Sequence, residues 1–142
     1  MKFSRALYDE NNQKGIKIAN NFLTQQGYTF VNDIESYKSH DFIVKKDNKL
    51  YKIEVEVSRI WKDQRFPFRS MTVPYRKKDS QADLFIQTNV FGNYLNLCPM
   101  TTVKTSDIIT KDTCFTTNEK FFNVSLSNIQ QFIFHDNTWI PV

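Results

Sequence analysis

The sequence predicts an α/β or α+β fold, in which helices flank a central mixed β-sheet, in a single domain over residues 1–142. A stretch with helical spacing opens the chain, and short runs of β-branched and aromatic residues follow it. No internal repeat, low-complexity tract or linker rich in proline and glycine divides the chain. The composition, 40% hydrophobic and 15% aromatic, is that of a folded protein.

The first predicted element is a helix over residues 12–26, which Gly27 follows as a C-cap. Its apolar residues recur at helical spacing: Ile16, Ala19, Phe22 and Leu23. Strands are predicted over residues 28–31, 40–46 and 50–58. Between the last two strands, Asp47-Asn48 has the composition of a hairpin turn, so these strands are expected to pair.

The second half of the chain is predicted to alternate short strands with short helices. Its elements are strands over residues 82–88, 94–98 and 121–126, a short helix capped by Thr105 or Ser106 and running through Ile109, and a helix after Ser127 that covers Ile129, Phe132 and Ile133. These helices are expected to cover the sheet.

Carboxylates gather on one face of the strand over residues 50–58, because successive side chains on a strand point to opposite faces. One face is apolar and consists of Tyr51, Ile53, Val55 and Val57. The other face consists of Lys52, Glu54, Glu56 and Ser58. The two glutamates stand roughly 7 Å apart, where like charges repel unless a cation lies beside them. A solvated face that bears ordinary ion pairs explains the same pattern equally well.

A third carboxylate comes from the neighbouring strand. The hairpin turn at Asp47-Asn48 places Asp41 opposite Glu54 or Glu56, within a slip of one or two residues. Asp41 and Glu54 are therefore expected to share one metal ion. Oxygen ligands of this kind suit Mg²⁺ or Mn²⁺.

Basic residues concentrate between Arg59 and Lys78, where seven basic residues face one acidic residue, Asp63. They are Arg59, Lys62, Arg65, Arg69, Arg76, Lys77 and Lys78. Such a segment is typical of proteins that bind the phosphate backbone of nucleic acid. Four aromatic residues interleave with it and are candidates for stacking on bases or for packing against the sheet: Trp61, Phe66, Phe68 and Tyr75.

No apolar run approaches the roughly 18 residues that span a bilayer, and the N-terminus lacks the apolar region of a signal peptide. The sequence therefore predicts a cytoplasmic protein without a membrane partner.

The order of helix, aspartate-bearing strand, hairpin and E-x-E strand resembles the PD-(D/E)XK nuclease superfamily, which includes restriction enzymes, junction resolvases and small phage nucleases. The resemblance covers residues 12–98 and rests on residues 22–28, on residues 39–44 (SHDFIV) and on residues 53–58 (IEVEVS). It implies a restriction-endonuclease-like core and a nuclease dependent on Mg²⁺ or Mn²⁺, with DNA favoured over RNA. Small nucleases of this type often form homodimers.

Carried over onto this sequence, the resemblance implies that Asp41, Glu54 and the carbonyl of Val55 hold the metal. Glu56 stands where the superfamily usually has lysine. Some members have E-x-E there, and the second glutamate is then expected to orient or deprotonate the attacking water. Lys52 or Lys62 is expected to supply the missing cation.

A second departure lies in the first helix, where a metal-supporting glutamate of the superfamily corresponds to Ile16. The two departures keep two alternatives open. One is a catalytically inactive nucleic-acid-binding protein of the same fold. The other is a small protein-interaction or inhibitor module whose basic segment meets an acidic partner.

Overall fold

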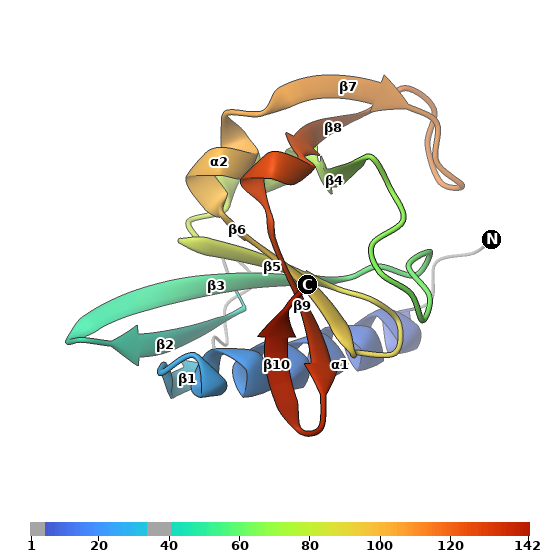
Figure 1. Ribbon diagram of the computed structural model, residues 1–142. Helices are drawn as coiled ribbons and strands as arrows, with labels where there is room; N and C mark the ends of the chain where they lie inside the picture. The colour runs from blue at the N-terminus through green and yellow to red at the C-terminus, as the bar shows by residue number, and fades with distance from the viewer. Residues whose placement is uncertain (1–4, 34–40) are drawn as a thin grey trace.

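Within residues 5–33 and 41–142, which the computed structural model describes, ten strands form two sheets (Figure 1). The seven-stranded sheet has the order β1-β2-β3-β5-β6-β9-β10, with β1 at Thr29–Asp33, β2 at Phe42–Lys46, β3 at Lys49–Val57, β5 at Leu84–Thr88, β6 at Tyr94–Pro99, β9 at Gln130–His135 and β10 at Thr138–Pro141. The three-stranded sheet has the order β4-β8-β7, with β4 at Ser70–Pro74, β8 at Glu119–Ser125 and β7 at Asp107–Lys111. The helices are α1 at Arg5–Gln25, α2 at Met100–Lys104, and the 3₁₀ turns η1 at Tyr75–Asp79 and η2 at Leu126–Asn128.

The large sheet is mixed, because β3 and β5 run parallel while its other neighbouring strands run antiparallel. Figure 1 shows α1 along one face of this sheet, and α2 with the small sheet on the other face. The prediction of an α+β fold with a mixed sheet flanked by helices is confirmed at this level.

The predicted first helix forms and begins earlier in the chain than expected. Ala19, Phe22 and Leu23 are fully buried against the large sheet. Gly27 ends the helix at a φ of +96°, in the left-handed region that glycine tolerates. The helix lies so close to β3 that a Cβ added at Gly15 would come within 3.0 Å of both Val55 and Val57.

The hairpin between β2 and β3 turns where the sequence predicts. Asp47 and Asn48 both have positive φ angles, of 52° and 63°, as a two-residue type I′ turn requires. The register pairs Lys46 with Lys49 and Phe42 with Ile53. Residue 40, with which this strand was predicted to start, lies outside the described residues.

A second apolar core lies between the large sheet and the small one, and β4 contributes to it. Met71 and Val73 on β4 pack against Phe122 and Val124 on β8 and against Phe85 on β5. β4 was not predicted from the sequence, because basic residues surround this short strand.

Two predicted helices of the second half are wrong. The residues after Ser106 form the exposed strand β7, and the short helix α2 precedes them. The residues after Ser127 form only the turn η2 and then the hairpin of β9 and β10. The hairpin turns at Asp136 and Asn137, whose φ angles are 50° and 61°. It packs on α1, where Phe22 contacts Phe132 and Trp139 at ring-centroid distances of 4.7 and 5.7 Å.

No helix in the described part of the chain is both long enough and apolar enough to cross a membrane.

Candidate active site

Two carboxylates meet at the start of β2, opposite the middle of β3. The register that pairs Phe42 with Ile53 brings Asp41 opposite Glu54, as the turn predicted. The backbone of Asp41 continues the pairing, since its amide donates to the carbonyl of Ile53 at 2.7 Å. The side chain of Asp41 accepts a hydrogen bond from the amide of Val55 at 2.7 Å. Asp41 is therefore fixed to the edge of β3 by its main chain and its side chain.

The Asp41–Glu54 pair is buried and electrostatically unfavourable. Glu54 is only 7% exposed. Burial, the charge of Glu54 and a hydrogen bond between the two carboxyl groups raise the pKa of Asp41 to about 6, and the amide of Val55 and the charge of Lys77 oppose this rise. A proton or a cation shared by the pair would relieve the repulsion.

Lys77 on η1 supplies the cation of this site. Its ammonium lies 2.5 Å from Oε1 of Glu54, and both side chains are largely buried. Burial alone would lower the pKa of Lys77, but the neighbouring acids outweigh it and raise that pKa. Lys77 was predicted to be one of the nucleic-acid-binding residues, and the structure places its ammonium against Glu54, at the acid pair.

Lys52 and Lys62 do not take the place predicted for the missing cation. The cationic charges that act on Asp41 and Glu56 come from Lys77 and Arg76. Asp83 holds the main chain of Lys52: the amide of Lys52 donates to Oδ2 of Asp83 at 2.8 Å, and the amide of Asp83 donates to the carbonyl of Lys52 at 2.8 Å. Lys62 lies beyond the end of β3, in the loop that the turn after β5 fixes.

Glu56 lies next to Glu54 on the same face of β3 but has a different neighbour. Nε2 of Gln87, which pairs with Glu56 across β3 and β5, donates to Oε1 of Glu56 at 3.1 Å. Burial of the carboxyl group raises the pKa of Glu56, and Gln87, Lys77 and Arg76 oppose this effect. Among the described residues, no three acidic, histidine or cysteine side chains converge closely enough to hold a metal. Asp41 and Glu54 meet as a pair, and Glu56 lies beside them with Gln87 as its hydrogen-bond partner.

A row of buried polar side chains continues from Glu56 across the sheet, and it was not predicted from the sequence. The paired residues Gln87 and Asn96 follow Glu56 on β5 and β6. Both are buried, and Oε1 of Gln87 and Oδ1 of Asn96 have no hydrogen-bond donor among the described residues. A single polar residue inside an apolar strand sequence, such as Gln87 in residues 84–88, was the available signal.

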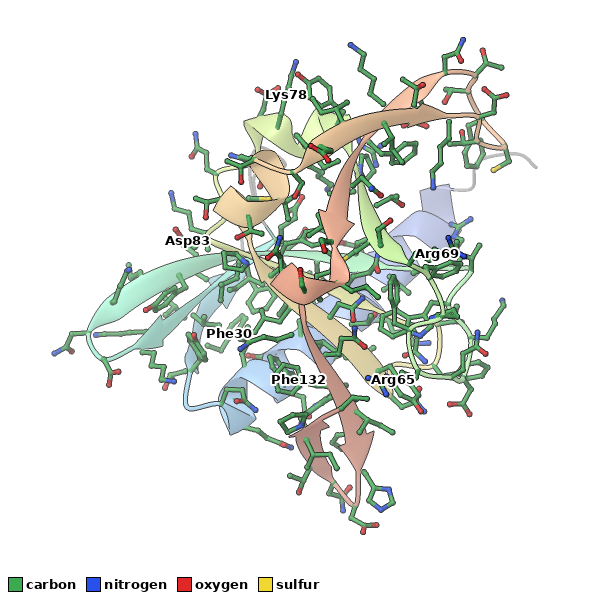
Figure 2. All side chains as sticks on the ribbon, turned by 45° about the horizontal axis from the view of Figure 1, so that its top comes forward. Phe30, Arg65, Arg69, Lys78, Asp83 and Phe132 are labelled. Atoms are coloured by element: carbon green, nitrogen blue, oxygen red, sulfur yellow. The ribbon has the colours of Figure 1, made fainter. Side chains whose placement is uncertain are left out.

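The predicted basic segment divides into two parts in space. Figure 2 shows Arg65 and Arg69 on one side of the molecule and Lys78, on η1, well apart from them. In the part on η1, Arg76 forms an ion pair with Glu119 at 3.8 Å and Lys78 lies 4.8 Å from the ring centre of Tyr75. The part over residues 59–69 lies beyond the carboxyl end of β3. The helix residue Ile16 packs against the apolar core on the opposite face of the sheet, so this position supplies no carboxylate to the acid pair.

In comparisons with protein-family models, with curated proteins and with solved structures, none matches this chain.

Proposed function

We propose that this protein is a metal-dependent nuclease of the PD-(D/E)XK type that hydrolyses phosphodiester bonds, with DNA as the favoured substrate. The observation that carries the proposal is the buried pair of Asp41 and Glu54 on adjoining strands, with the ammonium of Lys77 against it. Buried like charges lower the stability of the protein unless a bound cation offsets their repulsion. Carboxyl groups whose pKa is raised in this way are typical of functional sites.

The pair suits a hard divalent cation. Mg²⁺ keeps several of its waters and binds proteins through one or two carboxylates together with phosphate oxygens, so two acids suffice. The carbonyl of Val55 remains the proposed third protein ligand, on the resemblance and because the amide of the same residue already binds Asp41. When bound, Mg²⁺ or Mn²⁺ would neutralise phosphate charge and acidify water.

The other residues of the site have roles that follow from their charge. Lys77 is the proposed counterpart of the lysine that the E-x-E motif lacks, and it stabilises negative charge that develops on the phosphate. Glu56 is the proposed acceptor of a proton from the attacking water. Its raised pKa brings it nearer to the neutral range, in which a general base works best.

Cleavage assays test the proposal directly. Duplex DNA, single-stranded DNA and RNA are incubated with the protein and Mg²⁺, Mn²⁺ or a chelator. We expect cleavage with metal alone, loss of cleavage in Asp41→Asn and Glu54→Gln, and a decrease of about 10²-fold in Lys77→Met. Asp136→Asn, which removes an exposed acid from the β9–β10 turn, is the matched control and should retain full activity. Cleavage by Asp41→Asn at the rate of the wild type would refute the proposal.

A catalytically inactive nucleic-acid-binding protein is the second candidate, and it is favoured by Glu56 in place of the usual lysine and by Ile16 in place of a helix glutamate. It predicts binding that depends on salt and is indifferent to metal. Titration with Mn²⁺ alone separates the two candidates. A nuclease should bind Mn²⁺ through Asp41 and Glu54, and an inactive protein should bind it no more tightly than Asp41→Asn does.

A further inference from the structure

Residues 59–69 form a well-anchored loop beyond the carboxyl end of β3. The indole N–H of Trp61 donates to the carbonyl of Gln64 at 2.7 Å. The turn after β5 holds the same loop, because Asn89 donates to the carbonyl of Lys62 at 3.0 Å and Val90 donates to the carbonyl of Trp61 at 3.0 Å. Side chains that leave this loop therefore start from a fixed backbone.

Aromatic rings run from the core to the surface along this loop. Trp61 is 1% exposed and contacts the ring of Phe66 at a centroid distance of 4.9 Å. Phe66 contacts Phe68 at 5.3 Å, and Phe68 is 37% exposed. Trp61 is therefore too buried to stack on a base, whereas Phe68 is exposed to solvent and packs against Phe66.

The loop that carries the exposed ring also carries exposed cations. Lys62, Arg65 and Arg69 are exposed, and none of them has an acidic partner among the described residues. The acid of this loop, Asp63, accepts a hydrogen bond from Asn93 at 2.7 Å. Arginines without partners beside an exposed aromatic ring are the combination with which proteins hold single strands, through phosphate contacts and base stacking.

The loop lies apart from the acid pair. Val57, the last residue of β3, is three residues from Glu54, which corresponds to roughly 10 Å along the strand, and the loop begins two residues further on. A substrate that reaches both places therefore extends over several nucleotides. A base inside a duplex is already stacked on both sides, so an aromatic ring gains a stacking contact only with an unpaired base.

We propose that the loop over residues 59–69 binds single-stranded nucleic acid, with Phe68 stacked on an unpaired base and Arg65 and Arg69 on the flanking phosphates. Resting on the proposed function, this inference narrows the substrate to nucleic acid that has unpaired nucleotides several positions from the scissile bond.

Binding in the absence of metal tests the inference separately from cleavage. A labelled oligothymidylate strand, alone or annealed to oligoadenylate, is titrated with the full chain in a chelator, and fluorescence anisotropy is measured. We expect tighter binding of the single strand and a loss of about tenfold or more in Phe68→Ala. Phe68→Trp should retain the affinity. Arg65→Gln with Arg69→Gln should lower the salt dependence, with the slope of log K against log[salt] decreasing by about 0.7 for each lost phosphate contact.

The matched controls come from the β1–β2–β3 end of the large sheet. Phe30 is exposed to nearly the same extent as Phe68, at 39%, and Figure 2 places it far from Arg65 and Arg69. Phe30→Ala and Lys45→Gln should leave the affinity unchanged, and thermal unfolding shows whether each variant is folded. Equal affinity for both strand forms, or an equal loss in Phe30→Ala, would overturn the inference. If binding depends on Phe68 but no cleavage is found, the nuclease proposal is rejected and this inference stands. If cleavage is found and Phe68→Ala does not affect it, the nuclease proposal stands and this inference is rejected.

Discussion

The two faces of β3 are buried to a similar extent and have opposite chemistry. On the face toward α1, Ile53 and Val55 are 0% and 7% exposed and pack in an apolar core. On the other face, Glu54 is also 7% exposed, but it lies against Asp41 and Lys77. Burial stabilises the first face and raises the free energy of the charges on the second. Stability and the proposed chemistry therefore occupy opposite sides of a single strand.

The largest expected effect lies on the apolar face. Ile53→Ala should lower the free energy of unfolding by about 4 kcal/mol, because it leaves a cavity in a fully enclosed core. The adjacent change Glu54→Gln should alter it by less than about 1 kcal/mol, because relief of the repulsion with Asp41 offsets the lost contact with Lys77. Urea unfolding in a chelator measures both values. Equal losses in the two variants would remove the contrast between the faces.

Removal of the cation on the acidic face should have the next largest effect. Lys77→Met leaves Glu54 and Asp41 buried without compensation and should cost about 2–3 kcal/mol at pH 8. In a Glu54→Gln background the same change should cost less than about 1 kcal/mol, since the buried charge is gone. A double-mutant cycle from urea unfolding supplies the coupling. A coupling near zero would show that the ion pair does not matter for stability.

Asp41→Asn should stabilise the protein by about 1–2 kcal/mol at pH 8 in a chelator, while it abolishes cleavage. The folded-state pKa of Asp41, about 6, lies above its ordinary value of 3.8. Its protonation therefore contributes stability that is complete below about pH 4 and is lost as the pH rises through 6. The advantage of Asp41→Asn should accordingly vanish near pH 4. Thermal unfolding of both proteins between pH 4 and 8 checks the sign, and an advantage that grows toward low pH would contradict it.

The smallest expected effect comes from the turn that sets the register of the acid pair. Asn48→Ala should cost about 1 kcal/mol, because alanine tolerates the left-handed conformation poorly. Asn137→Ala, at the same place in the second Asp-Asn turn, should cost a similar amount. Only the first change should also weaken Mn²⁺ binding, since only that turn positions Asp41 against Glu54. Equal Mn²⁺ affinities in the two variants would separate the turn from the site.

The first half of the fold follows from local signals in the sequence. The helical spacing before Gly27, the Asp47-Asn48 turn and the alternation in β3 together predicted the register that places Asp41 opposite Glu54. The same Asp-Asn signal recurs at Asp136-Asn137, but the apolar residues before it also fit a helix. Packing of β9 on β6 and α1 decides for a strand, and no local pattern contains that information.

The composition of the site could be predicted only in part. Asp41, Glu54 and Glu56 were found because alternation on a strand is a short-range property. The role of Lys77 was not, because its contact with Glu54 joins residues 23 positions apart through a long connection that includes β4. Position in three dimensions also separates Arg65 from Lys78, which the sequence places in one basic segment.

The parallel pairing of β3 with β5 has a consequence for how the chain assembles. A chain that leaves one strand and enters a parallel neighbour must travel back along the sheet, and here the returning segment carries the 59–69 loop at its beginning and η1 near its end. The hairpin of β2 and β3 is local and is expected to form early, with its two acids already facing each other. Their lysine arrives only when the return is complete. We therefore expect Lys77→Met to accelerate unfolding and to leave the refolding rate almost unchanged, as happens for contacts made after the transition state.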